Sequence, residues 1–292
     1  MSQSPERTGA IYDLGYRVYD GPRLGRRQAI ESLYFQGVRS AFGLGRRPAA
    51  KVAPFVLAAL ALIPAVVYLG LAAIAPADLE LIATYDYLGI IFVILILFVA
   101  AVGPEIVGRD LRYRTLSLYF TRPIARDDYA IARLAALATA TLAVTLAPQV
   151  VLVIGNALAA NSAWDYIREE WLELPRIIVS GAVAASYSAA LGLSISSYTS
   201  RRSFAMGGIV ALFFMSTAVA NILAEVAGGW WILLDPGEQL RAVTLIVFNR
   251  DPGADEALSR YDVPLAAGAA ALIAVVVVAS AIVVRRYRKV GA

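Results

Sequence analysis

Six runs of apolar residues, each about 20 residues long or longer, constrain this chain more than any other feature. A helix of about 20 apolar residues can cross the roughly 30 Å hydrocarbon core of a bilayer. Hydrophobic residues make up 59% of the 292 residues and charged residues only 16%, whereas soluble domains carry about 25% charged residues. The sequence therefore predicts an all-α, polytopic membrane protein with six transmembrane helices, over about Val52–Ala75, Tyr87–Val107, Tyr129–Ala160, Arg176–Tyr198, Phe204–Ala227 and Pro264–Val284.

The positive charges fall mainly on one side of these predicted spans. The tail 1–51, the loop after span two with Arg133, the loop 199–203 and the tail 285–292 hold 21 of the 26 Lys and Arg residues. Cytoplasmic loops of membrane proteins carry such an excess. We therefore expect a multi-pass protein of the cell membrane with both termini cytoplasmic and with residues 52–284 as its transmembrane domain. Arginines beside span ends contact anionic lipid, so membrane lipid is an expected partner and nucleic acid is not.

Missing residue types exclude several kinds of chemistry. The chain has neither Cys nor His, which excludes thiolate nucleophiles, Ser-His-Asp triads and the common zinc sites. Its two lysines, Lys51 and Lys289, do not follow the glycines of a G-x-x-x-x-G-K-[ST] loop, the phosphate cradle of many ATPases. We expect no metal site, no cofactor of its own and no enzymatic activity.

The stretch Arg26–Arg47 has the periodicity of an amphipathic helix. Its apolar residues recur at helical spacing on one face, and polar residues fall mainly on the other; the apolar face is Ile30, Leu33, Tyr34, Val38, Ala41 and Phe42. Such a helix should lie in the membrane interface. It is either a general surface anchor or an elbow helix that packs against the spans.

The loop 105–128, between spans two and three, mixes arginines with large apolar residues. Five apolar side chains occur within ten positions: Leu111, Leu116, Leu118, Tyr119 and Phe120. A solvated loop has no need of them, so they favour a short helix that docks into a partner's groove; the alternative is a charged loop that only fixes topology. Pro123 should end this helix, and Asp127 or Asp128 can cap the next one.

The segment 228–263 precedes the last span and is the longest loop. Two apolar pieces, Trp230–Leu234 and Leu240–Phe248, flank the breaker Asp235-Pro-Gly237. Each is too short to span a membrane. The segment is therefore either a re-entrant hairpin, buried in protein at membrane depth, or an aromatic anchor at the interface.

At this point a family resemblance is evident. The chain resembles the membrane subunit, or permease, of ABC-2 type transporters, which are prokaryotic exporters paired with a separate ATP-binding subunit. The signature is an acidic–Arg–acidic group, a Thr-Leu pair and an Arg-Pro-x-x-Arg group: Glu105, Arg109, Asp110, Arg114, Thr115, Leu116, Arg122, Pro123 and Arg126. Arg114 stands where the family usually has glycine. Segments 12–17, 19–23 and 285–289 are similar to actinobacterial members.

The resemblance implies a coupling helix over about Arg109–Phe120 that inserts into a cleft of the ATP-binding subunit, with Leu116 and Leu118 as apolar contacts. It also implies that ATP and magnesium are bound by that partner. Two permease copies and two ATPase subunits would form the working unit, with the pathway for exported cargo at the permease dimer. Glu105 should form an ion pair with an arginine such as Arg109, one helical turn away.

Few polar residues lie in the predicted spans, and four of them are candidates to line a pathway: Glu225, Asn221, Asn156 and Gln149. The amides could equally join helices, and Glu225 could be a hydrated end of its span. The small residues Gly181, Ala185 and Ala189 permit close helix packing, within the chain or with a second copy. The alternative function is an autonomous ion-coupled secondary carrier, which should place carboxylates near the membrane midplane.

Overall fold

The computed structural model describes residues 25–72, 83–113, 115–121, 123–160, 162–254 and 256–289. Within these ranges all regular structure is helical, so the predicted all-α class is confirmed. The predicted motif segments 12–17 and 19–23, together with Arg114 and Arg122, lie outside the described residues.

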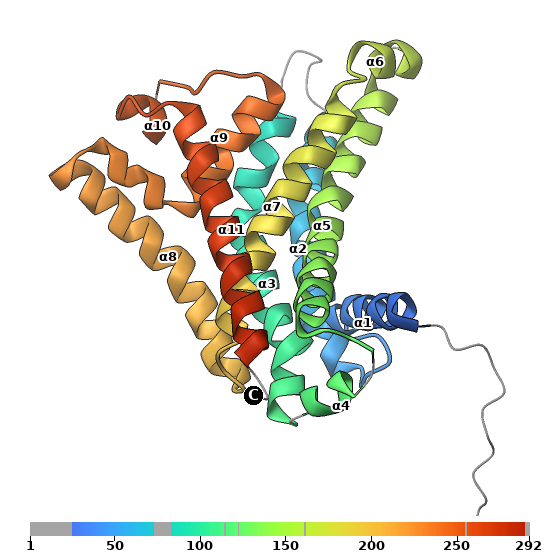
Figure 1. Ribbon diagram of the computed structural model, residues 1–292. Coiled ribbons are helices and arrows are strands. Elements are labelled where there is room, and N and C mark those ends of the chain that lie inside the picture. Colours follow the sequence, from blue (N-terminus) through green and yellow to red (C-terminus); the bar gives the residue numbers. More distant parts are fainter. Residues whose placement is uncertain are drawn as a thin grey trace, which may run out of the picture.

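Six long apolar helices form the body of the molecule (Figure 1), and each coincides with a predicted span. They are α2 (Ala49–Ala72), α3 (Tyr87–Arg112), α5 (Arg126–Ala159), α7 (Glu173–Ser196), α8 (Arg202–Ala227) and α11 (Leu265–Lys289). Helices α3 and α11 each continue five residues past their predicted ends. Since all six are long and apolar enough to cross a bilayer, the chain is a six-span membrane protein.

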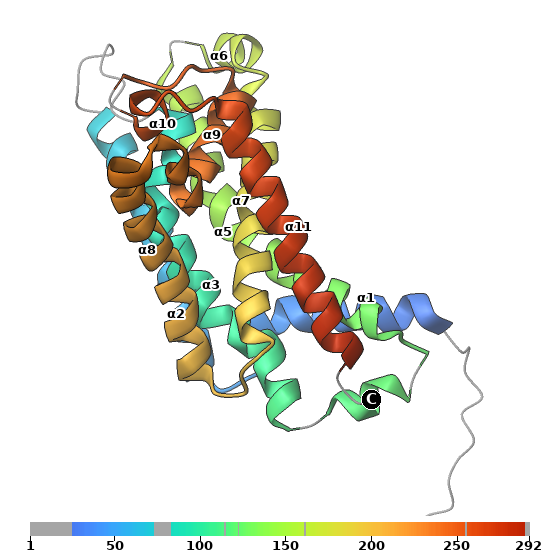
Figure 2. The same cartoon turned by 60° about the vertical axis from the view of Figure 1, so that its left-hand side comes forward.

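The bundle has two distinct ends (Figures 1 and 2). The short helix α4 (Leu116–Phe120) lies at one end, which we call the α4 end. Helices α6 (Ala163–Glu169) and α10 (Ala257–Arg260) lie at the other, the α6 end. Helix α6 lies in the connection between the third and fourth predicted spans.

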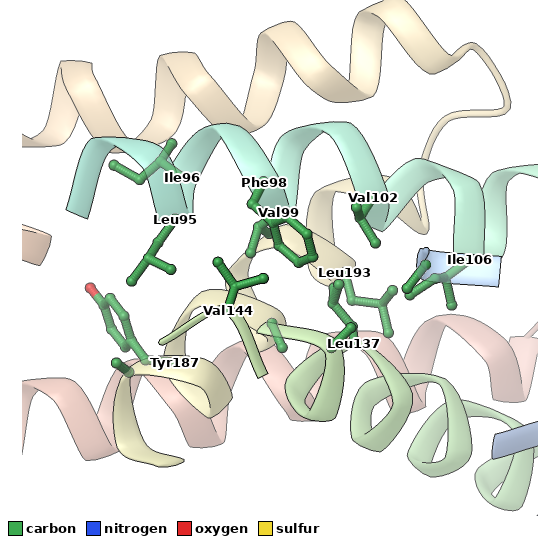
Figure 3. Packing of buried hydrophobic residues seen from close by; sticks show 14 of the residues in the cluster. Leu95, Ile96, Phe98, Val99, Val102, Ile106, Leu137, Val144, Tyr187 and Leu193 are labelled. Atoms are coloured by element: carbon green, nitrogen blue, oxygen red, sulfur yellow. The ribbon is translucent and has the colours of Figure 1, made fainter. Parts of the chain in front are cut away.

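Helices α3, α5 and α7 form the centre of the bundle. Their most apolar stretches are 67%, 50% and 61% buried, whereas those of α2, α8 and α11 are only 22% buried. Phe98 and Val99 of α3 gather with Leu137 and Val144 of α5 and Leu193 of α7 in one buried cluster (Figure 3). The outer faces of α2, α8 and α11 therefore present apolar side chains to the surroundings, as lipid-facing helices do.

The small residues of α7 pack against another helix of the same chain. Gly181, Ala185 and Ala189 are all buried. A Cβ atom at Gly181 would meet the Leu146 side chain of α5 at 3.0 Å, so the small residue allows α5 and α7 to approach closely. These small residues could pack within the chain or against a second copy, and the structure shows packing within the chain.

Helix α1 (Gly25–Ala41) lies across the α4 end and packs against α5 and α3 (Figure 2). Leu33, Gly37 and Ala41 on its apolar face are buried. The hydroxyl of Tyr34 shares a hydrogen bond of 2.9 Å with that of Thr139 on α5. Of the two interpretations of this helix, packing against the spans is therefore confirmed.

The segment before the last span contains the 3-10 helix η2 (Gly229–Leu234) and the helix α9 (Pro236–Phe248). Helix α8 leans away from the bundle, and η2 returns from its far end towards the centre (Figure 1). Helix α9 then packs against α7 and α11, with Pro236 and Leu240 buried. The segment is thus a returning hairpin packed on the protein, although Trp230 at its turn is exposed.

Candidate functional site

The loop predicted to contact a partner consists of two helices. Helix α3 continues to Arg112, and a separate helix α4 begins at Leu116. The prediction of one helix over Arg109–Phe120 is therefore wrong in its extent. The break has a local cause, because the backbone N–H of Thr115 donates to the Asp110 carbonyl at 3.1 Å and its hydroxyl lies 3.4 Å from the Asp110 carboxylate.

Most apolar side chains of the loop pack on the protein itself. Leu116 is buried at 5% exposure, whereas Leu118 is 67% exposed. The rings of Tyr119 and Phe120 contact the Tyr129 ring, with centroid distances of 5.8 and 6.4 Å. The prediction that Leu116 and Leu118 both face a partner is wrong for Leu116, because the short α4 turns its first residue into the core. Leu118 is the exposed leucine of α4.

A buried ion pair lies beneath α4. The Asp110 carboxylate at the end of α3 accepts hydrogen bonds from the Tyr129 hydroxyl at 2.6 Å and from the Arg133 guanidinium at 2.7 Å. Arg133 is only 2% exposed and stacks over the Tyr129 ring at 5.1 Å. Tyr287 of α11 completes the cluster, with its ring centroid 5.0 Å from that of Tyr129.

Sequence reasoning identified Asp110 but missed its two partners on α5, Tyr129 and Arg133. In the sequence, Arg133 is one of several basic residues near a span end and Tyr129 marks the start of a span. The available signal was the i, i+4 spacing of Tyr129 and Arg133, which places a phenol and a guanidinium on one helix face. Arg133 also lies just inside the span predicted from Tyr129, and an ionisable residue within a span is grounds for proposing a functional site.

Glu105 of α3 joins three segments at the α4 end. Its carboxylate binds Arg46, in the connection between α1 and α2, at 2.6 Å and Arg202 of α8 at 2.8 Å. The predicted partner was Arg109, whose side chain lies outside what the structure describes. The observed ion pairs join Glu105 to residues of other segments. The i, i+4 rule applies to neighbours on one helix and cannot predict such pairs.

The first turn of α5 carries two further ion pairs. Asp128 binds Arg26 of α1 at 2.8 Å and accepts the Ala125 N–H at 2.9 Å, so it caps α5 from the third helical position. Asp127 binds Arg288 of α11, with 2.7 Å between Nε and Oδ1. Arg126 donates to the Arg288 carbonyl at 2.7 Å.

The prediction that Asp127 or Asp128 caps this helix is thus confirmed for Asp128. Pro123 is exposed in the connection between α4 and α5. It lies three residues beyond the last residue of α4, in agreement with its predicted role of ending that helix.

The four candidate pathway residues do not converge on one site. Gln149 of α5 is fully buried and donates to the Thr145 carbonyl of its own helix at 3.1 Å. Asn156, also on α5, lines a polar pocket at the α6 end. Asn221 and Glu225 are exposed on α8, which leans away from α5 across the bundle (Figure 1).

A pair of acidic residues at the start of α9 was not predicted. Asp235 is 6% exposed and caps α9 by accepting the Gly237 N–H at 2.8 Å. It also accepts hydrogen bonds from Thr217 at 3.0 Å and Asn221 at 3.2 Å, which tie α9 to α8. One carboxylate oxygen of Glu238, one turn further on, is buried with no hydrogen-bond partner among the described residues.

The pKa of Glu238 should make the stability of this hairpin depend on pH. Burial, with the charges of Asp235 and Glu256 opposed by Arg241, raises its pKa to about 7, against about 4.3 in an unfolded chain. The folded state then binds a proton more tightly than the unfolded state, so stability falls as pH rises between these two values. Glu238→Gln should remove that loss, adding about 1–2 kcal/mol at pH 8 and nothing near pH 4.

This prediction can be checked by unfolding the purified wild-type and Glu238→Gln proteins in detergent at a series of pH values between about 4 and 8. The exposed Glu170 supplies the control, since Glu170→Gln should leave the pH profile unchanged. A Glu238→Gln profile parallel to the wild type would contradict the assignment.

Comparisons with family models and with curated proteins returned no match to this sequence. The fold nevertheless defines the class: a helical, polytopic membrane protein with six candidate spans. Its α4 end gathers α1, α3, α5, α8 and α11 through ion pairs around a short helix with one exposed leucine.

Proposed function

We propose that the protein is the membrane-spanning subunit of an ATP-driven exporter of the ABC-2 type. In this proposal the α4 end faces the cytoplasm and a separate subunit binds ATP and magnesium there. Two copies of the chain form the pathway, and this chain has no enzymatic activity of its own. The excess of Lys and Arg in the segments at the α4 end supports the cytoplasmic orientation.

The exposed Leu118 on α4 is the observation that carries this proposal. A leucine that is 67% exposed on a five-residue helix outside the spans is suited to dock into an apolar groove of a partner protein. Tyr113, between α3 and α4, is 66% exposed and is a second large exposed side chain of this loop.

The ion pairs around α4 support its role in transmitting movement. Asp110 lies at the base of the loop and is bonded to Tyr129 and Arg133 of α5. A displacement of α4 would therefore reach α5 through directed bonds, since packed elements with two discrete arrangements carry such coupling. ATP can drive the change only if it binds one arrangement more tightly than the other.

The test is co-expression with candidate ATP-binding subunits of ABC transporters from the same genome, followed by affinity purification in detergent. Leu118→Asp should place a charge in the contact and reduce the recovered ATPase at least tenfold, a change of about 1.4 kcal/mol or more. The chain itself should still elute as a folded protein, because Leu118 is exposed. Leu116→Asp would not be informative, because burial of that residue predicts unfolding.

Leu172→Asp is the matched control, because Leu172 is 41% exposed but precedes α7 at the α6 end. It should leave the recovered ATPase at the wild-type amount. The proposal fails if no ATPase associates with the wild type, or if Leu118→Asp and Leu172→Asp behave alike.

Asp235 and Glu238 favour one alternative, an ion-coupled secondary carrier. Such carriers build their ion and substrate sites where helices are interrupted within the membrane domain, and these two carboxylates lie at such an interruption, where α9 begins. Proteoliposomes separate the two functions: uptake of a cargo driven by a proton or sodium gradient, without ATP or a partner, would favour the carrier.

A further inference from the structure

A polar pocket at the α6 end has the features of a binding site that is separate from the α4 surface. It has a volume of about 320 Å³ and lies where α2, η1 (Thr84–Asp86), α5, α6, α7 and α9 meet. Ligand sites usually enclose about 300–1,000 Å³. A pocket at the lower limit of this range suits a small solute or a headgroup.

One wall of the pocket presents a carboxylate in a fixed position. Glu173, in the first turn of α7, accepts a hydrogen bond from the Thr84 hydroxyl at 2.7 Å through one oxygen. Its other oxygen accepts the Tyr166 hydroxyl of α6 at 3.3 Å. Each carboxylate oxygen has more than one acceptor position, so Glu173 keeps capacity for a further donor such as an ammonium group.

Two guanidinium groups also line the pocket. Arg176 lies one turn after Glu173 on α7, and Arg250 follows the end of α9. Within the described ranges, neither forms an ion pair with a carboxylate. Neighbouring Arg241, by contrast, is neutralised by Asp86 and Glu256, each at 2.6 Å.

The backbone turn after α9 directs Arg250 towards the pocket. Asn249 adopts a left-handed conformation with φ of 53°, which is typical of the residue that ends a helix. Arg250 then returns to place its guanidinium 5.6 Å from the centre of the Tyr85 ring. The same ring is held by Arg241, which stacks at 5.4 Å and donates to the Tyr85 carbonyl at 3.4 Å.

Aromatic rings complete the lining. Tyr85 packs against Phe248 with a centroid distance of 6.2 Å, and Tyr68 and Tyr166 lie on the other helices around the pocket. Aromatic faces attract a cation that sits within about 6 Å of the ring centre. The carboxylate and the rings therefore suit an ammonium group, and the two arginines suit a phosphate or carboxylate.

We propose that this pocket binds a small zwitterion, with an ammonium group at Glu173 and an anionic group between Arg176 and Arg250. The ligand is a free solute or the headgroup of a lipid such as an ethanolamine phospholipid, since both carry the same pair of charges. The proposal depends on the pocket alone and stands whether or not the chain works with an ATPase.

The test uses the purified full chain in detergent, with phosphoethanolamine as the zwitterionic probe. Binding is measured by isothermal titration and by the rise in melting temperature. Phosphoethanolamine should bind saturably and at least about tenfold more tightly than inorganic phosphate or ethanolamine alone. A short-chain phosphatidylethanolamine that binds tighter still would identify the lipid as the source, and weaker binding would identify the free solute.

Arg250→Gln and Glu173→Gln should each weaken phosphoethanolamine binding at least about tenfold. Arg260→Gln is the matched control, because Arg260 is exposed at the same end but does not line the pocket. If Glu173→Gln lowers the melting temperature without ligand, Arg176→Gln replaces it and should weaken binding to the same extent. Equal binding of phosphate or ethanolamine alone, no saturable binding, or variants that bind like the wild type would overturn the proposal.

Discussion

Asp110→Asn should be among the most destabilising single substitutions in this chain. The change removes the charge that neutralises Arg133, which is 2% exposed and lies 2.7 Å from the Asp110 carboxylate. An uncompensated charge in such a position costs about 3–5 kcal/mol. Unfolding of the purified protein in detergent, followed by circular dichroism, would measure the loss.

Two further variants separate this effect from a general sensitivity of the α4 end. Asp127→Asn breaks an ion pair with Arg288, whose side chain is 61% exposed, and should cost less than about 1 kcal/mol. Combining Asp110→Asn with Arg133→Met removes both charges and should recover much of the loss. If Asp110→Asn and Asp127→Asn were equally mild, the pair beneath α4 would not be a buried ion pair in solution.

Gly37→Ala should displace α1 from the bundle and lower stability by about 1–3 kcal/mol, the usual cost of overpacking. A Cβ atom at Gly37 would lie 2.5 Å from the Ala136 Cβ on α5. An alanine methyl cannot rotate out of the way, so one of the two helices must move. The change in melting temperature, together with cross-linking between α1 and α5, would detect the movement.

Gly70→Ala is the matched control for this glycine. Gly70 lies in helix α2, and a Cβ there would have no atom within 4 Å. Alanine is the better helix former by about 1 kcal/mol, so this variant should be as stable as the wild type or more so. A Gly37→Ala protein that matches Gly70→Ala would show that α1 is not held tightly against α5.

The six spans were predictable because their length and composition are properties of the sequence alone. The same holds for α1, whose apolar face at Leu33 and Ala41 follows the helical period and is buried as expected. The ends of the helices were less predictable: α11 continues to Lys289, and Tyr287 in this extension is buried against Tyr129. Nothing in the hydropathy of the basic tail indicates that contact.

The candidate site was predictable only in part, because its decisive contacts join distant segments. The sequence spacing predicts an ion pair between Glu105 and Arg109. In the fold, Glu105 instead forms ion pairs with Arg46 and Arg202. Leu116 and Leu118 are equally apolar and lie two residues apart, so only the position of α4 distinguishes the buried one from the exposed one. The pocket at the α6 end likewise depends on six segments that no local pattern brings together.

The two consecutive carboxylates of α5 have a mechanical consequence. Asp128 holds the beginning of α1 and Asp127 holds the end of α11, so the first and last described helices are attached to a single helical turn. Any rotation of that turn would swing both helices together. A shift of either helix relative to the third span must therefore break its ion pair with that turn.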